Sequence, residues 1–432
     1  MVDSGLNHGG VIYQSCDLDP EGNFYPPTLI TDVESSHPLV QEEIFGPVLV
    51  SMTFRTQSEA VKLANNSRYG LAASVWSENI NRAMDVAPKV KAGVIWINCH
   101  NQFDASCGFG GVKESGFGRE GGKEGLFEYL KPLGLKPASK TDSKPIKAKE
   151  VVIDRTLKLY IGGKQVRPDG GHSIETFNSD GSHASYVGSG NRKDIRNAVS
   201  AASKALSWGS LSGHGRAQII YFIAENLSVR ESEWTERLIS LCGVTKKQAK
   251  AEFDESICRL FSYAAWADKY DGAVHSAPYR GVTMALPEPI GVLAQIAPEE
   301  TPLLSTISLI APAIAMGNRV VLIPSQKYAS VALELVQTFE TSDVPAGVIN
   351  IVSGDKQTLS EQLAGHAEVD AIWCWAEHEV LSLIESISAN DLKRLWANAD
   401  GDRDWVDPLQ GEGLEFLRNA TEVKNIWTPY GD

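Results

Sequence analysis

Val292-Leu293-Ala294-Gln295-Ile296 is one of three short apolar runs that decide the fold of the longer part of this chain. The other two runs lie at residues 319–323 and 348–352, and segments with helical spacing lie between the runs at 303–316 and 330–338. Short runs rich in β-branched residues that alternate with helices are typical of buried parallel strands. We therefore expect an α/β fold in which these units form half of a Rossmann-like sheet.

The segments before this sheet predict a hairpin and several long helices. Residues 157–161 and the following turn, Gly162-Gly163, predict the hairpin. A helix is expected over residues 246–270, where Phe253 and Leu260 belong to an apolar stripe that is more often core than ligand contact. Helical spacing also predicts helices over residues 192–208 and 216–229.

The first 130 residues show the same alternation. Buried strands are expected at 72–76 and 93–98, and helices at 58–65 and 81–89. This order predicts a second parallel α/β arrangement. The glycine-rich run at 108–122 lacks a strand before it and a helix after it in the order that a phosphate loop requires, so it predicts an ordinary loop.

Residues 131–150 interrupt the alternation with three Lys-Pro pairs and three further lysines. Because this composition disfavours packing, we expect a solvated linker. A polybasic patch that contacts anionic lipid or acid-rich protein is the alternative. The expected domains are residues 1–130, a linker at 131–156, and residues 157–432.

The composition argues against several classes of protein. With 432 residues, of which 43% are hydrophobic and 22% charged, the chain is typical of a soluble protein with more than one domain. The net charge of −14 argues against nucleic-acid binding. The N-terminal residues do not resemble a signal peptide, and the longest apolar run is too short and polar for a membrane span, so we expect no membrane association and a cytoplasmic location.

The six cysteines contain no CxxC pair, which predicts free thiols. Cys99-His100 has no second ligand pair at a workable spacing, so we expect no metal site.

Two pairs of motifs resemble the aldehyde dehydrogenase superfamily. The first pair is Glu42-Glu43-Ile44-Phe45-Gly46-Pro47 and Phe109-Gly110-Gly111-Val112-Lys113-Glu114-Ser115-Gly116. The second pair is Pro289-Ile290-Gly291-Val292 and Gly317-Asn318-Arg319-Val320-Val321. In the superfamily the second pair precedes the first within one catalytic unit. The reversed order resembles the two-domain aldehyde dehydrogenase family 16, with the C-terminal part of a first unit followed by a degenerate, truncated second unit.

The resemblance implies an aldehyde dehydrogenase-like fold: a partial catalytic α/β domain, a Rossmann-like half and oligomerisation strands. Residues 124–130 are echoed at 412–417, before a strand-like run at 421–427, so we expect both units to end in the same docking strand. Such strands would join copies in a homo-oligomer or join the two units of one chain. The resemblance also implies NAD or NADP as cofactor, and a cysteine that forms a thiohemiacetal before hydride transfer and hydrolysis.

Two residues of the first unit match cofactor-binding positions of the superfamily. Glu43 matches the carboxylate that holds the nicotinamide ribose, since one carboxylate can accept from two vicinal hydroxyls. Phe45 matches the ring beside the nicotinamide. The alternative is that Glu43 is a surface acid at a helix end and Phe45 is part of the core. On the first interpretation the site is vestigial or partial.

Five positions of the second unit depart from the superfamily. Glu300 replaces the asparagine that donates to the oxyanion, and an ionised carboxylate can only accept. Ile323 replaces the lysine that reaches the adenosine ribose and Gln326 the nearby acid, which weakens dinucleotide binding by about ten-fold or more. Ala376 replaces a glycine at the pyrophosphate, where Glu377 adds negative charge. These changes predict that the chain alone binds no cofactor.

None of the six cysteines stands in the sequence context of the superfamily's nucleophile, so we assign no catalytic residue. Loss of a catalytic nucleophile commonly costs about six orders of magnitude in rate. We expect a non-catalytic member that acts as a structural or interaction scaffold, with protein partners. The alternative is a part of an NAD(P)-dependent aldehyde dehydrogenase whose catalytic cysteine lies upstream. A third class is an interaction module that acts through the basic linker.

Overall fold

The computed structural model describes residues 1–16, 18, 23–131, 156–278 and 280–430, which form two compact units. Unit 1 contains Met1–Glu128, Val274–Ala285 and Lys424–Asp432, and unit 2 contains Tyr129–Ala273 and Leu286–Val423. The predicted linker falls mainly on residues 132–155, which lie outside the described residues.

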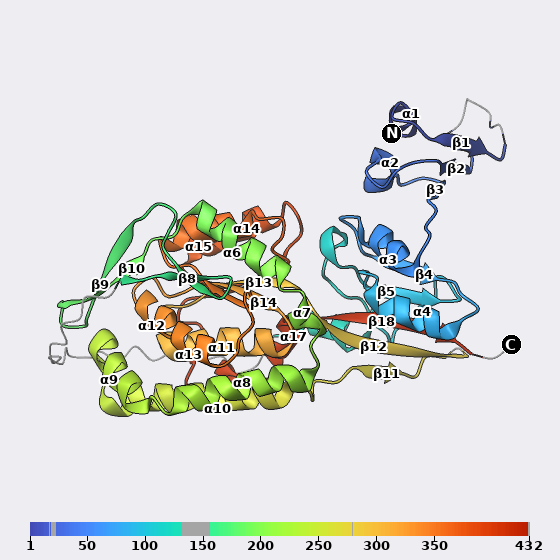
Figure 1. Cartoon of the computed structure of the whole chain (residues 1–432). Helices are drawn as coiled ribbons and strands as arrows, with labels where there is room; N and C mark the ends of the chain where they lie inside the picture. The colour runs from blue at the N-terminus through green and yellow to red at the C-terminus, as the bar shows by residue number, and fades with distance from the viewer. Residues whose placement is uncertain (17, 19–22, 132–155, 279, 431–432) are drawn as a thin grey trace. The chain divides into compact units, whose positions relative to one another are not determined.

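A seven-stranded sheet forms the centre of unit 2, in the order β17-β16-β13-β14-β15-β7-β8 (Figure 1). The strands from β17 to β15 are parallel, and β7 joins β15 in the antiparallel sense. The predicted α/β fold class and the three predicted central strands are thereby confirmed. The strands are β7 (Leu159–Ile161), β8 (Lys164–Val166), β13 (Val292–Ile296), β14 (Arg319–Ile323), β15 (Ile349–Ile351), β16 (Ala371–Ala376) and β17 (Arg394–Ala399).

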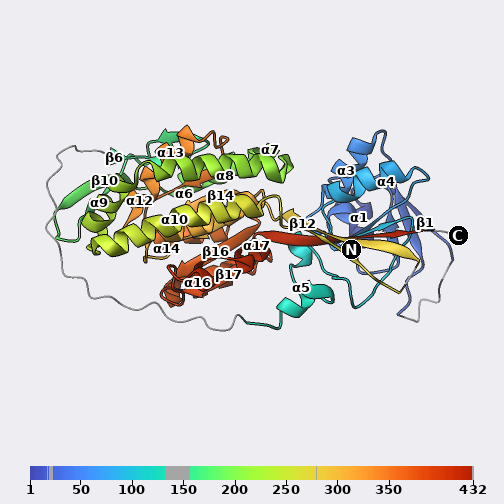
Figure 2. The same cartoon turned by 90° about the horizontal axis from the view of Figure 1, so that it is seen from below.

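Side chains of β13 alternate between two apolar cores on opposite faces of this sheet. Leu293 packs into one core, whereas Val292 and Ala294 pack into the other. Figure 1 shows that α8, α10 and α11 cover one face and α6, α14 and α15 the other, and in Figure 2, seen from below, α8 and α10 lie on the side nearer the viewer. Because both faces are covered, these strands have continuous apolar sequences. The helices are α6 (Arg192–Lys204), α8 (Gly213–Ser228), α10 (Lys246–Trp266), α11 (Pro302–Ala315), α14 (Lys356–Ala364) and α15 (His378–Ser388).

Two of the predicted helices of unit 2 are interrupted. The helix expected over 192–208 ends at Lys204, because Ala205 has a non-helical ψ of 44°, and the short α7 (Ser207–Ser210) follows. The helix expected over 330–338 is divided at Leu335 into α12 (Ala329–Glu334) and α13 (Val336–Thr341). The ψ of −21° at Leu335 is typical of 3₁₀ geometry, which the apolar spacing does not reveal.

The predicted hairpin is confirmed as β7 and β8, joined by Gly162 and Gly163 with φ angles of 60° and 75°. Two successive positive φ angles define the type I′ turn, which suits glycine. A separate sheet of unit 2 has the order β6-β10-β9. Its strands and the neighbouring helix are β6 (Thr156–Leu157), β9 (Ser173–Phe177), β10 (His183–Gly188) and α9 (Glu231–Cys242).

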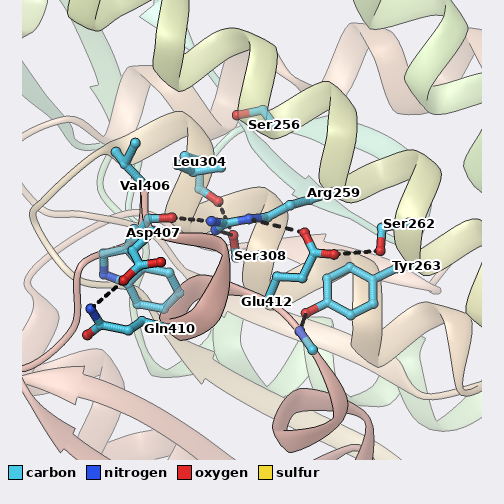
Figure 3. A network of polar contacts seen from close by, with 12 residues as sticks. Ser256, Arg259, Ser262, Tyr263, Leu304, Ser308, Val406, Asp407, Gln410 and Glu412 are labelled. Atoms are coloured by element: carbon cyan, nitrogen blue, oxygen red, sulfur yellow. Dashed lines mark hydrogen bonds and ion pairs between the residues drawn. The ribbon is translucent and has the colours of Figure 1, made fainter. Parts of the chain in front are cut away.

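A buried arginine of α10, Arg259, links α11 to the chain around residues 405–412 (Figure 3). Arg259 has an exposed fraction of 0% and donates to the Ser308 hydroxyl and to the Trp405 carbonyl. Its Nε lies 3.9 Å from Oε2 of Glu412, whose Oε1 accepts a hydrogen bond of 2.7 Å from Ser262. The α10 helix is thus bound to the chain around residues 405–412 by polar contacts inside the core. That segment also contains α16 (Pro408–Gly411), and α17 (Leu414–Asn419) follows it.

Unit 1 contains a five-stranded sheet, β11-β12-β18-β5-β4, and a three-stranded sheet, β1-β2-β3. In the larger sheet β18 pairs in parallel with β5, with Ile426 opposite Ile95, so segments from the two ends of the chain share one sheet. The predicted strand at 421–427 is confirmed. The strands are β1 (Val11–Gln14), β2 (Thr28–Thr31), β3 (Val48–Val50), β4 (Ala72–Val75), β5 (Val94–Ile97), β11 (Ala273–His275), β12 (Gly281–Pro289) and β18 (Thr421–Pro429).

The glycine-rich run of unit 1 forms a loop, as predicted. Phe109 and Glu120 form an isolated antiparallel bridge across it. A Cβ at Gly93 would collide with the Gly110 carbonyl, so these glycines allow the loop to pack against the start of β5. The helices of unit 1 are α1 (Val2–Leu6), α2 (Pro38–Gln41), α3 (Gln57–Asn65), α4 (Ile80–Val86) and α5 (Gly122–Phe127).

Candidate dinucleotide site at the carboxyl ends of the strands

The candidate site lies in unit 2, where the strand order reverses. From β13 the chain continues to β14 on one side of the sheet and later returns to β16 on the other side. In open α/β sheets, ligands bind in the crevice outside the carboxyl ends of the strands at such a switch point. The segments that follow β13, β14, β16 and β17 therefore decide whether a dinucleotide fits.

Four carboxylates occupy these segments, and one lysine follows β15. Glu299 and Glu300 follow β13, Glu377 follows β16, and Asp400 follows β17. Lys356, the first residue of α14, is 8% exposed, and its Nζ lies 3.4 Å from Glu299 Oε1 and 4.0 Å from Asp400 Oδ2. One ammonium therefore faces several negative charges.

The Glu299 carboxylate is fully hydrogen-bonded. Its Oε2 accepts from the Ser325 hydroxyl at 2.5 Å and from the Lys327 N–H at 3.1 Å, and its Oε1 accepts from the Gln326 N–H at 2.9 Å. Burial alone would raise the pKa of Glu299, but Lys356 and these donors together lower it below its usual value. Glu299 is consequently ionised at neutral pH.

The pKa of Asp400 is shifted in the opposite direction. Burial, which Lys356 only partly offsets, and the nearby carboxylates of Glu300, Glu299 and Glu377 raise the pKa of Asp400 to about 6. Burial is the largest cause of this shift, and the neighbouring carboxylates add to it. A pyrophosphate at this edge would face the same carboxylates, which repel negative charge.

The structure brings the five sequence-predicted positions of unit 2 to this edge of the sheet. Ile323 is the fully buried last residue of β14, and Ala376 is the buried last residue of β16. The Gln326 side chain accepts a hydrogen bond of 2.8 Å from the Lys356 N–H. Glu377 is exposed at the start of α15, and Glu300 has a buried Oε2 without a hydrogen-bond partner among the described residues. Their correspondence to cofactor contacts stays a prediction.

Glu43 and Phe45 belong to unit 1 and lie on its surface after α2. Phe45 has an exposed fraction of 89% and a φ of 53°, and Glu43 is exposed too. The alternative in which Phe45 is a core residue is therefore wrong. Whether the two residues contact a ligand stays a prediction.

Sequence reasoning gave no role to Glu299, Lys356 or Asp400. Glu299 lies in the same motif as Glu300, and its position directly after a predicted strand was the available signal. Asp400 follows β17, a strand that the sequence did not predict. Lys356 begins α14 after β15, and only the fold shows that its side chain faces the other strand ends.

Five of the six cysteines lack the lowered pKa of an activated thiol nucleophile, and the sixth, Cys16, is exposed. Cys374 lies in β16, and burial raises its pKa to about 12. Burial also raises the pKa of Cys99, Cys107 and Cys242, whereas a nucleophilic thiol needs a lowered pKa. Cys258 is exposed, and desolvation together with nearby acids raises its pKa as well.

No group of three or more His, Cys, Asp or Glu residues that could hold a metal ion is found among the described residues. In the same part of the chain, no helix is both long and apolar enough to cross a membrane.

A sequence pattern of the aldehyde dehydrogenase family matches residues 1–132 and 166–406, and the chain belongs to this family. It is 47% identical to the betaine aldehyde dehydrogenase of Bacillus subtilis (strain 168) over 114 residues, which cover 26% of this chain and 23% of that protein. It is 43% identical to aldehyde dehydrogenase 1A1 of Gallus gallus over 132 residues, which cover 30% of this chain and 26% of that protein. The matched part thus spans about a quarter of the length of these curated relatives.

Solved structures of the family share the fold. The NAD-dependent aldehyde dehydrogenase from Sinorhizobium meliloti matches with a TM-score of 0.55 and 24% identity, over 57% of this chain and 50% of that chain. A point mutant of the betaine aldehyde dehydrogenase from Staphylococcus aureus, in complex with NAD+, matches with a TM-score of 0.54 and 25% identity. The match covers 56% of this chain and 50% of that chain.

Proposed function

We propose that this chain is a non-catalytic member of the aldehyde dehydrogenase family that acts as a structural or interaction scaffold. The observation that supports this most strongly is the group of carboxylates at the switch point of the sheet in unit 2. Glu299, Glu300, Glu377 and Asp400 lie where a dinucleotide phosphate would need positive charge or free N–H donors. The raised thiol pKa values support the same proposal.

The proposal includes an architecture that resembles aldehyde dehydrogenase family 16: the end of a first unit at 1–130, a linker at 131–156 and a degenerate unit at 157–432. We further propose a cytoplasmic location, and association through strands, either between copies or within one chain. The β18–β5 pairing supports association within the chain.

A second candidate is supported by the intact motif around Glu43 and Phe45. On this alternative the chain is part of an NAD(P)-dependent aldehyde dehydrogenase whose catalytic cysteine lies upstream. The exposure of both residues is compatible with a cofactor that approaches from outside unit 1. Mapping the 5′ end of the transcript tests this: coding sequence upstream of Met1 with a cysteine in the family context would favour it.

Calorimetric titration of the purified chain with NAD+ and NADP+ tests the first candidate. We expect no measurable heat of binding and no NADH fluorescence after addition of an aldehyde. An active betaine aldehyde dehydrogenase under the same conditions is the positive control. Tight NAD+ binding, or NADH formation that grows with protein concentration, would contradict the proposal.

A further inference from the structure

The Glu299 carboxylate lies among four hydrogen-bond donors. Oε1 accepts from the Gln326 N–H and faces Lys356 Nζ, and Oε2 accepts from the Ser325 hydroxyl and the Lys327 N–H, at 2.5–3.4 Å. A carboxylate has about four lone-pair sites, so this one is saturated.

The four donors together resemble an oxyanion site. Successive backbone N–H groups, as at Gln326 and Lys327, form concave sites that bind anions. A hydroxyl and an ammonium are the side-chain donors that such sites commonly add. Ser325 is 2% exposed and Lys356 is 8% exposed, so both are held by the surrounding core. We call these donors of Ser325, Gln326, Lys327 and Lys356 the oxyanion cradle.

Glu299 is not required to cap the helix that follows it. The first N–H groups of α11, those of Leu303 and Leu304, donate to the buried carboxylate of Glu252 at 2.9 and 3.3 Å. Between Glu299 and α11, Thr301 has φ and ψ angles of 41° and 65°, which cost a β-branched residue about 1–2 kcal/mol. The loop therefore has a strained residue at Thr301 in the same structure in which Glu299 contacts the cradle.

We propose that Glu299 is a built-in ligand that fills the oxyanion cradle and closes it to phosphate groups. The inference rests on the proposed function and deepens it, because it names what occupies the phosphate-facing part of the degenerate site. An intramolecular ligand on a short connection has an effective concentration in the millimolar range or above, so free phosphate does not displace it. The contact is autoinhibitory: without the Glu299 carboxylate, the cradle would bind a phosphoryl oxyanion.

Thermal unfolding of the full chain with added inorganic phosphate tests this proposal, with chloride at equal ionic strength as reference. In Glu299→Ala, phosphate at about ten times its Kd should raise the unfolding midpoint by roughly 3–5 °C. The wild type should not respond. Glu300→Ala is the matched control, since it removes the same charge from the adjacent residue without changing a cradle contact. The double change Glu299→Ala with Lys356→Met should lose the response.

A parallel titration with AMP distinguishes the source of the phosphoryl group. A response of Glu299→Ala to either ligand supports the proposal, and the tighter of the two identifies free phosphate or a nucleotide as the preferred ligand. Near-UV circular dichroism checks the fold, and Glu299→Ser, whose shorter side chain also leaves the cradle empty, replaces Glu299→Ala if the alanine variant is unfolded.

Two results would overturn the proposal. One is a folded Glu299 variant that responds to neither ligand. The other is an equal response of Glu300→Ala, which would assign the effect to net charge alone. Binding of NAD+ by the wild type would instead contradict the proposed function, so the two failures are distinguishable.

Discussion

Arg259 is a charged residue that lies fully buried in unit 2. Its replacement by methionine would leave the Trp405 carbonyl, the Ser308 hydroxyl and the Glu412 carboxylate without their cationic partner. We expect Arg259→Met to lower the free energy of unfolding of unit 2 by about 2–4 kcal/mol. Urea unfolding monitored by tryptophan fluorescence measures this loss.

Arg196 on α6 is the matched control for this measurement, because it is exposed. Arg196→Met should change stability by no more than about 0.5 kcal/mol. Equal losses in the two variants would mean that the contacts in Figure 3 contribute nothing specific.

Glu252 makes the stability of unit 2 depend on pH. Burial raises the pKa of Glu252 to about 7, although the N–H groups of Leu303 and Leu304 oppose the shift. Since the unfolded carboxyl titrates near 4.5, the unfolded chain releases its proton first as pH rises. The stability due to the neutral carboxyl is therefore present below about pH 4.5 and is lost as pH rises towards 7.

Glu252→Gln keeps an acceptor for the start of α11 and removes this titration. The thermal unfolding midpoint of the variant minus that of the wild type should rise between about pH 4.5 and 7 and then stay constant. Thermal unfolding across this range measures it, with exposed Glu236→Gln as control. A difference that does not vary with pH would contradict the shifted titration.

At the scale of elements, Thr301 is a strained connection between β13 and α11. Asparagine tolerates the left-handed region better than threonine, so Thr301→Asn should stabilise unit 2 by about 1 kcal/mol and raise its midpoint by roughly 2–4 °C. Thr245, the N-cap residue before α10, has a φ of −70° and is therefore the unstrained control position. If Thr245→Asn gave the same gain, relief of backbone strain would not be the cause.

The sequence predicted some elements better than others, for physical reasons. β13 and β14 were predicted with their observed bounds, because continuous burial on both faces gives a short apolar run, which here follows a glycine and precedes a proline. β17 was not predicted, since each of its residues is only partly buried and its run Arg394–Ala399 mixes polar and apolar side chains. The break at Leu335 was missed because apolar spacing continues across it.

At the scale of the whole molecule, the parallel pair β18–β5 joins segments from the two ends of the sequence. If this pairing is intramolecular in solution, the unfolding midpoint should not change over a hundredfold dilution, because no association step contributes. Ile426→Ala should lower the stability of unit 1 by about 2–4 kcal/mol and remain independent of dilution. A midpoint that falls on dilution would indicate strand exchange between copies.

The candidate site was only partly predictable because it is assembled from strand ends that are distant in sequence. Motif comparison identified Glu300, Gln326, Ala376 and Glu377, each judged by the residue it replaces. The order of the strands determines which donors Glu299 contacts. It also places Lys356 between Glu299 and Asp400. Strand order is set by long-range pairing, which local spacing does not encode.

Helix α11 is buried along its whole length, including Ser305, Thr306 and Ser308. Such a helix has no face that water can solvate, and its cover comes from α8 and α10 before it and from segments as far as α17 after it. During synthesis, the ribosome must therefore deliver about a hundred further residues before the helix can be enclosed. We expect the nascent chain to engage a chaperone over this interval, so that release and final packing of unit 2 occur together.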